Sequence, residues 1–230
     1  MKIAVILILL GQAYISWRTF KILPFPVWGK WVVVLLMLMA LVALVLRFVR
    51  QFQGVSNLLL DTVLYDVGTS WLVVLLYLVL AFAVMDIGVA THLIPKGFSH
   101  HSAKASMVVF GAVFALMAYG YVNYNVKKRV ELNFTTSKSL PKPLKLVLLS
   151  DVHLGYHIGK QEFAKWVDMI NAENPDLILI AGDIVDISLY PIRKQRFEEE
   201  FHRLKAPVYA CYGNHEYFSN IGGRNQYCGA

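Results

Sequence analysis

Residues 144–155 read LKLVLLSDVHLG, residues 177–186 read LILIAGDIVD and residues 207–216 read PVYACYGNHE. Each stretch begins with a short apolar run, which is the pattern of a buried β-strand, and then continues into small and polar residues. Between these stretches lie residues 160–171, whose apolar side chains fall on one helical face, and the charged residues 192–204, which we interpret as a second helix. The alternation of strand and helix predicts a parallel α/β sheet with right-handed crossovers.

Polar residues follow the three predicted strands at a regular spacing. Asp151 and Asp183 are 32 positions apart, and Asp183 and Asn214 are 31 positions apart, which suits βαβ units of about 30 residues. Because the carboxyl ends of parallel strands meet at one edge of a sheet, we expect these three side chains to gather there. Gly182 and Gly213 allow the chain to turn sharply and to approach closely at this edge.

The residues expected at this edge have the chemistry of a metal site. Two carboxylates and one carboxamide are joined by the imidazoles of His153 and His215. This set of oxygen and nitrogen donors, without a thiolate, suits Mn²⁺, Fe, Zn²⁺ or Mg²⁺. A carboxylate on the central strand can bridge two ions about 3.5–4 Å apart, as two-metal hydrolases require. Each short motif alone also occurs in turns and helix caps, but three of them at strand ends favour a site. Asp186 is expected near its rim.

The blocks LLSDVHLG, IAGDIVD and CYGNHE resemble the first three signature blocks of the calcineurin-like metallophosphoesterases. The resemblance implies that Asp151 and His153 bind a first metal ion, that Asp183 bridges two ions and that Asn214 binds the second. It implies that His215 is catalytic: it does not bind metal but lies over the phosphate, where it assists the leaving oxygen or stabilises charge.

The resemblance further implies hydrolysis of a phosphate ester or phosphoanhydride by a water activated at two divalent ions (Mn, Fe, Zn or Mg). A manganese-dependent phosphodiesterase is one form of this expectation. The alternative is a non-catalytic membrane sensor or binding module built on a phosphoesterase-like domain. The presence of both carboxylates together with His153, Asn214 and His215 favours the enzyme. A transporter with a regulatory domain is disfavoured, because Asp86 is the only acidic candidate within the predicted spans and lies near the end of one.

The family also has later histidines, including a Gly-His-x-His block, whereas this sequence contains no Gly-His pair. We therefore expect residues 144–230 to be the N-terminal half of the phosphoesterase domain, a parallel βαβαβ half. The C-terminal part of the domain and the remaining metal ligands are expected to lie beyond residue 230.

The sequence before these motifs has the composition of a membrane segment. Residues 1–125 contain eight Lys or Arg, three Asp and no Glu, whereas the remaining residues contain fourteen Lys or Arg and twelve Asp or Glu. Four apolar stretches approach the ~20 residues needed to cross a bilayer. We predict a bundle of four transmembrane helices over residues 3–20, 31–49, 70–90 and 105–125.

Three features organise the rest of this segment. The first apolar stretch has the shape of a signal peptide, but it lacks a clear small-x-small cleavage site, so we interpret it as an uncleaved span. Residues 52–67 are expected to form a short amphipathic piece at the membrane surface. Residues 126–143 are polar and contain two prolines, and they form the predicted linker to the α/β domain.

The charge distribution bears on partners and location. Five of the seven net positive charges belong to residues 1–125, where basic residues flanking membrane spans are expected, so nothing indicates nucleic acid. The expected partners are the lipid bilayer and a phosphorylated substrate, and an amphiphilic substrate would suit a membrane anchor. Four spans place both termini on one side of the cell membrane. The side of the membrane that carries the catalytic domain has one more basic residue near the span ends than the opposite side. By the positive-inside rule this favours a cytoplasmic catalytic domain. The six basic residues on that side are Lys2, Arg47, Arg50, Lys127, Lys128 and Arg129, and the five opposite are Arg18, Lys21, Lys30, Lys96 and Lys104.

Overall fold

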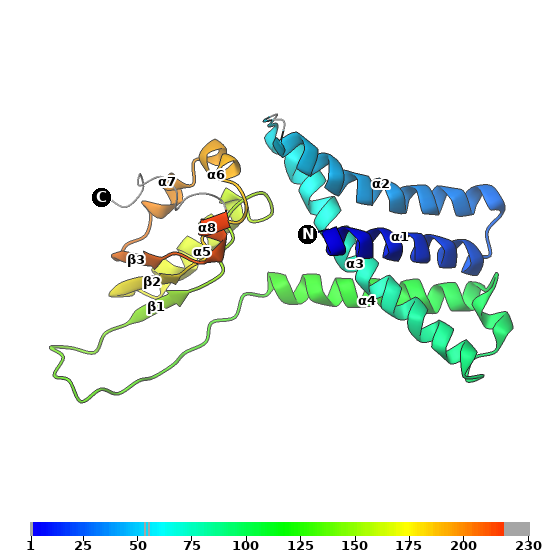
Figure 1. The fold of residues 1–230 in the computed structure, drawn as a ribbon. Helices are drawn as coiled ribbons and strands as arrows, with labels where there is room; N and C mark the ends of the chain where they lie inside the picture. The colour runs from blue at the N-terminus through cyan, green and yellow to red at the C-terminus, as the bar shows by residue number, and fades with distance from the viewer. Residues whose placement is uncertain (1, 53, 55, 219–230) are drawn as a thin grey trace. The chain divides into compact units, whose positions relative to one another are not determined.

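The computed structural model describes residues 2–52, 54 and 56–218. The chain divides into two compact units, which Figure 1 shows as a group of long helices and a small α/β part. The helical unit comprises Met1–Ser56 and Val63–Leu132, and the α/β unit comprises Asn57–Thr62 and Asn133–Ala230. This order of elements confirms the predicted fold class, a helical membrane segment followed by a parallel α/β domain.

Four helices of the described chain are long and apolar enough to cross a membrane. Most of their large apolar side chains point outward, as expected for surfaces that face lipid rather than water. Ser102 accepts a hydrogen bond from the backbone N–H of Ala105 and thereby caps the last of them. The helices are α1 (Lys2–Ile22), α2 (Val27–Phe52), α3 (Leu58–Ala90) and α4 (Ala103–Asn125).

The third helix is longer than the sequence indicated. The amphipathic piece expected over residues 52–67 is not separate, because α3 begins at Leu58 and continues without a break to Ala90. Gly68, which could have interrupted it, is needed where α3 crosses α2: a Cβ atom at this position would lie 2.7 Å from the Cα atom of Leu44. Small residues allow such close approach of membrane helices. At 1.5 Å per residue the 33 residues of α3 span about 50 Å, more than a bilayer core requires.

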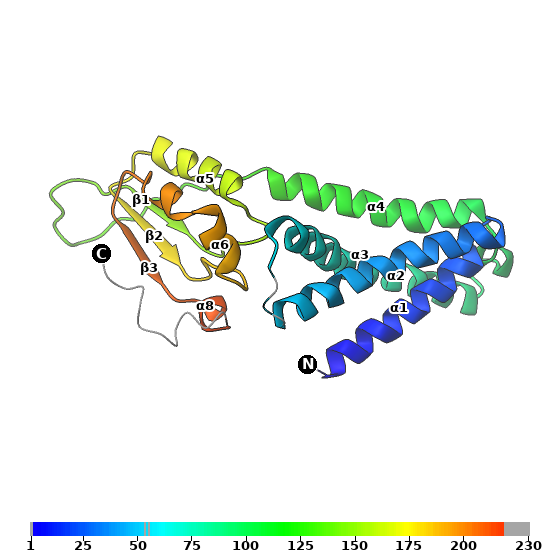
Figure 2. The same ribbon diagram turned by 90° about the horizontal axis from the view of Figure 1, so that it is seen from above.

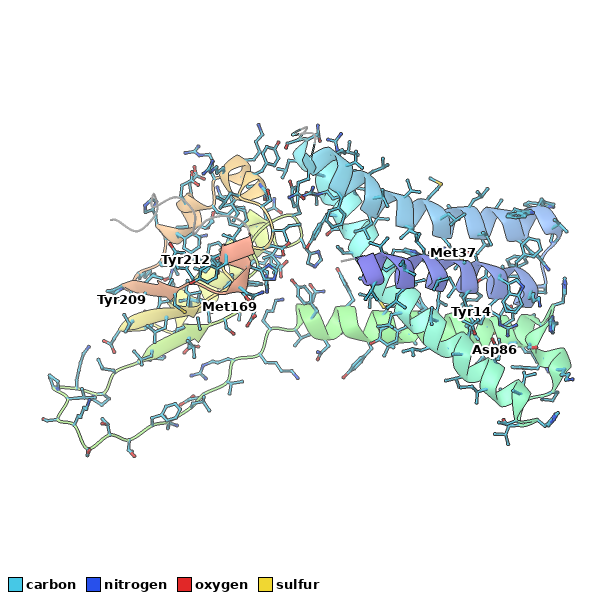
Figure 3. All side chains as sticks on the ribbon, viewed as in Figure 1. Tyr14, Met37, Asp86, Met169, Tyr209 and Tyr212 are labelled. Carbon is cyan, nitrogen blue, oxygen red and sulfur yellow. The ribbon has the colours of Figure 1, made fainter. Side chains whose placement is uncertain are left out.

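A polar cluster lies within the helical unit, between α1 and α3. The Arg18 guanidinium is 2.8 Å from one carboxylate oxygen of Asp86. The Tyr14 hydroxyl donates to the other oxygen at 2.6 Å, and both Tyr14 and Asp86 are labelled in Figure 3. Arg18 is buried, and its Cζ atom lies 5.7 Å from the ring centroid of Trp17 and 5.6 Å from that of Phe82. A charge in so apolar a setting needs a partner. The ion pair therefore gives Asp86, the acidic residue within the predicted spans, a structural explanation.

We expect Asp86→Leu to lower the free energy of unfolding by about 1–3 kcal/mol, because Arg18 would remain buried without its carboxylate. Arg18→Met should lower the free energy of unfolding by a smaller amount, because the Asp86 side chain that loses its partner is partly exposed to solvent. The double variant should recover most of the loss, since an apolar pair replaces both charges. Thermal unfolding of the full-length protein in detergent measures all three variants. Losses that simply add in the double variant would contradict this pairing.

The α/β unit contains a three-stranded sheet in the order β1-β2-β3 (Figures 1 and 2). Both pairs are parallel, with Leu146 opposite Leu177 and Ile178 opposite Val208, which confirms the predicted sheet. The amphipathic helix α5 (Lys160–Ala172) buries Phe163, Val167 and other apolar residues in the core beside the sheet. The strands are β1 (Leu146–Leu149), β2 (Leu177–Ala181) and β3 (Val208–Cys211).

The prediction of a single helix over residues 192–204 is wrong in detail. The structure has two short helices instead, α6 (Tyr190–Gln195) and α7 (Glu198–Phe201). They are separated where Arg196 takes the left-handed conformation, with φ of 58°. The break directs Phe197 into the core, where it is fully buried and its ring centroid lies 6.0 Å from that of Phe163. Tertiary packing thus overrides the helical pattern of this segment.

Candidate metal centre

The ends of the three strands converge on one group of metal-binding side chains. His153 follows β1, Asp183 follows β2 and His215 follows β3, in the short helix α8 (Asn214–Phe218). One donor atom from each of these three side chains lies within 4.8 Å of the others. The two imidazole rings stand edge to face, with centroids 4.5 Å apart. Residues 30 or more positions apart in the sequence are therefore assembled by the parallel pairing of the strands.

The backbone of this edge is held in an unusual conformation. Asp151, His153 and Asp183 all have positive φ, between 46° and 53°. The left-handed region costs of order 1–3 kcal/mol for a residue with a side chain, although Asp and His tolerate it better than bulkier residues. Such strain persists only where surrounding contacts impose it, and it is common at functional sites. Three residues predicted to be metal ligands therefore share this conformation at one edge of the sheet.

Backbone hydrogen bonds join the first two strand-end loops. The N–H of His153 donates to the carbonyl of Asp183 at 2.9 Å, and the N–H of Leu154 donates to the carbonyl of Ile184 at 2.7 Å. In return the N–H of Asp186 donates to the carbonyl of Leu154 at 3.0 Å. The parallel pairing of β1 and β2 is thus continued past the strands, and it fixes His153 relative to Asp183.

Two glycines let the second and third loops approach each other. A Cβ atom at Gly182, where φ is 74°, would lie 2.8 Å from the Cα atom of Gly213. A Cβ atom at Gly213 would lie 2.2 Å from the Oδ1 atom of Asp183. Any larger residue at either position would push the loops apart. These contacts give the two glycines the role that the sequence suggested.

The Asp183 carboxylate and the Asp186 backbone position His215. The backbone N–H of His215 donates to Oδ1 of Asp183 at 2.8 Å. The Nδ1 atom of His215 lies 2.9 Å from the carbonyl oxygen of Asp186. Because a carbonyl can only accept, Nδ1 carries the proton of this hydrogen bond, and Nε2 is the nitrogen that can take up or release a proton.

Asp186 lies closer to the site than the sequence indicated. Its side chain is mostly buried, and one carboxylate oxygen is 3.6 Å from Nδ1 of His215 and 4.0 Å from Nδ1 of His153. A Cβ atom at Gly155 would lie 3.2 Å from the Cβ of Asp186, so the glycine makes room for it. The Asp186 carboxylate therefore faces both histidines rather than the rim. In the sequence, the only signal for this location was that Asp186 follows Asp183 by three residues.

The other two predicted ligands lie at the same edge, outside the group of three. Asp151 is mostly exposed, with Oδ1 3.9 Å from Nε2 of His153. Asn214 is exposed and begins α8. Both are therefore accessible at the carboxyl edge of the sheet, on either side of Asp183 in the order of the strands.

Glu216 was given no role by the sequence analysis, yet it is buried beneath this edge. Its carboxylate accepts the backbone N–H groups of Gly213 at 2.7 Å and of Asp183 and Val185 at 2.9 Å. Burial by itself raises the pKa of Glu216, but hydrogen bonds from these and the Ile184 backbone outweigh it and hold the pKa below its usual value. In the sequence, the only signal for this role was that an acidic residue directly follows Asn214 and His215.

The arrangement fits a divalent metal ion. The His153 imidazole and the Asp183 carboxylate come from different strand ends and lie close enough to approach one ion. The His215 imidazole and the exposed Asp151 carboxylate lie beside them. Oxygen and nitrogen donors without a thiolate suit Mn²⁺, Fe, Zn²⁺ or Mg²⁺. Carboxyl ends of parallel strands are also where open α/β sheets bind their ligands.

Comparisons with known proteins agree with this geometry. Residues 144–229 match the model of the calcineurin-like phosphoesterase family. A protein of Danio rerio described as a transmembrane protein with metallophosphoesterase domain is 29% identical over 240 residues, covering 93% of this chain and 52% of its own length. An uncharacterized metallophosphoesterase of Helicobacter pylori is 30% identical over 129 residues, covering 53% of this chain and 34% of its own.

A further uncharacterized metallophosphoesterase, from Campylobacter jejuni, is 32% identical over 84 residues, or 36% of this chain and 22% of the relative. The chain thus spans about half the length of the Danio rerio relative and a smaller share of the two bacterial ones. No solved structure is significantly similar to it. The family match begins just before β1 and includes all three strand ends. Residues 144–229 therefore belong to the calcineurin-like metallophosphoesterase superfamily, and in the sequence they follow helices suited to a membrane.

Proposed function

We propose that the protein is a membrane-bound phosphoesterase that hydrolyses a phosphate ester or phosphoanhydride with the help of two divalent metal ions. The observation that carries this proposal is the convergence of His153, Asp183 and His215 from three strand ends within 4.8 Å of one another. Membership of the superfamily supports a phosphoesterase-type activity. In this geometry the candidate metal ligands His153 and Asp183 lie beside His215, a histidine that can donate a proton.

Four residues would hold the ions. Asp151 and His153 would bind one ion, Asn214 the other, and Asp183 would lie between them. The place of β2 between β1 and β3 supports a bridging role for Asp183, because its carboxylate lies between the loops of both neighbours. When bound, such ions polarise phosphoryl oxygens and lower the pKa of a water molecule, so that a nucleophile forms near neutral pH.

His215 would act on the phosphoryl group itself. The hydrogen bond from Nδ1 to the Asp186 carbonyl fixes the ring, so that Nε2 is the atom that exchanges protons. Protonated at Nε2, the ring would donate to the leaving oxygen or stabilise the negative charge that develops on the phosphoryl group.

The helical unit would attach the enzyme to the cell membrane. Its four candidate spans and the printed description of the Danio rerio relative support this placement. The excess of basic residues near the span ends favours a cytoplasmic catalytic domain. A membrane anchor suits an amphiphilic substrate such as a phospholipid, and it also suits simple tethering near the bilayer.

Asp183→Asn in the full-length protein is expected to lower the turnover of a generic phosphodiester by at least about 100-fold, because one lost charge affects both ions. Asparagine keeps an oxygen for the His215 N–H, so the fold should persist. Steady-state kinetics with saturating Mn²⁺ measures the effect, and Asp168→Asn on the exposed face of α5 is the control. Near-normal turnover of Asp183→Asn would overturn the two-ion proposal.

His215→Ala should lower turnover by about 100-fold or more while the bound metal content stays close to that of the parent protein, because His215 is proposed to transfer a proton and not to bind an ion. His153→Ala should lower both quantities. Metal analysis of the purified proteins separates the two roles, and the control is His202→Ala, because His202 is an exposed histidine directly after α7. Equal metal loss in His215→Ala and His153→Ala would mean that His215 is a ligand.

A further inference from the structure

Glu216 is a buried carboxylate that accepts hydrogen bonds from three backbone N–H groups. Its oxygens accept from the N–H groups of Asp183, Val185 and Gly213, all within 2.9 Å. Asp183 and Val185 belong to the loop after β2, whereas Gly213 belongs to the loop after β3. One side chain therefore connects two of the three loops that form the candidate metal centre.

The loop after β2 is shaped to bind an anion. Gly182 and Asp183 both take left-handed conformations, with φ of 74° and 51°. Such a turn directs nearby backbone N–H groups into one concavity, which is a typical anion-binding arrangement. The Glu216 carboxylate fills it, with Oε2 on the N–H of Asp183 and Oε1 on the N–H of Val185. The strained backbone that presents Asp183 is thus stabilised from beneath by this carboxylate.

One oxygen of Glu216 also sets the distance between the two loops. Oε2 accepts from Asp183 at 2.9 Å and from Gly213 at 2.7 Å, so both N–H groups point at the same atom. This holds Gly213 against Gly182, where no Cβ atom would fit. It also keeps the His215 N–H 2.8 Å from the Asp183 carboxylate.

The position of Glu216 in α8 has a second consequence. Successive residues of a helix point about 100° apart. Asn214 is exposed, His215 is half-buried and Glu216 is buried. Burial of Glu216 under the loops therefore fixes the rotation of this turn and with it the directions of Asn214 and His215, the two residues that the proposed function requires.

We propose that Glu216 is a positioning residue of the metal centre: its carboxylate fixes the backbone that carries Asp183, Asn214 and His215, without itself holding an ion or touching substrate. The proposal rests on the proposed function in so far as these residues bind metal. The positioning role can also be tested separately from that function. It concerns the backbone conformation of the two loops, which can be measured in the absence of metal and substrate.

The test compares Glu216→Gln and Glu216→Asp with Asp176→Asn in the full-length protein. Asp176 is a matched control, because its carboxylate also accepts a backbone N–H, that of Lys145 at 2.9 Å, but at the opposite, amino-terminal edge of the sheet. Glutamine has the shape of glutamate but only one acceptor oxygen. Mn²⁺ affinity by calorimetry should fall about 10–100-fold in Glu216→Gln, less in Glu216→Asp, and within about twofold of the parent protein in Asp176→Asn.

A second measurement needs neither metal nor turnover. In the metal-free protein, the amide proton resonances of Asp183, Val185 and Gly213 should move upfield in Glu216→Gln, because they lose a charged acceptor. Circular dichroism shows whether each variant is folded, and if Glu216→Gln is not, Glu216→Asp carries the comparison. Unchanged resonances and unchanged Mn²⁺ affinity in a folded Glu216 variant would overturn the proposal, as would an equal loss of affinity in Asp176→Asn. Shifted resonances in a protein that hydrolyses no phosphoester would support the positioning role while refuting the proposed function.

Discussion

The contact between the ends of β2 and β3 is the constraint on which the candidate site depends. Parallel pairing brings three strand ends to one edge, and a close approach of the loops after β2 and β3 brings Asp183 and His215 into contact. At Gly182 and Gly213 the two backbones nearly touch, with no space for a Cβ atom on either residue. This contact places the Asp183 carboxylate against the His215 N–H, and it leaves Glu216 beneath both loops.

The loops after β1 and β2 are strained at this edge. Asp151 and His153 in the first loop and Asp183 in the second take left-handed conformations. The cost is offset by hydrogen bonds that continue the pairing past the strands and by the Glu216 carboxylate below. The result is a set of polar side chains whose backbone is held by hydrogen bonds within the chain, and such fixed positions are what metal-assisted catalysis requires.

Sequence reasoning was most successful where the signal is periodic. Three apolar runs at βαβ spacing predicted the sheet and the convergence that His153, Asp183 and His215 show. It was least successful where tertiary contacts decide. Arg196 breaks a helical pattern because Phe197 is drawn into the core.

The contributions of three charged side chains could likewise not be read from the sequence. Asp186 lies beside His215, and Glu216 accepts the N–H of Val185. Both contacts join residues that are about 30 positions apart and meet only in the folded chain. In the helical unit, Asp86 looked like an isolated charge, and its partner Arg18 lies 68 positions away on another helix. Local pattern thus predicts which elements form, while the partners of buried charges depend on how those elements pack.

Binding of a divalent metal ion by the ends of β1, β2 and β3 is tested most directly by anomalous diffraction from crystals of the full-length protein grown with Mn²⁺. We expect an anomalous peak bonded to His153 and Asp183, at the carboxyl edge of the sheet. A protein saturated with Mn²⁺ whose peaks all lie elsewhere, for example beside His92, His100 or His101, would contradict it.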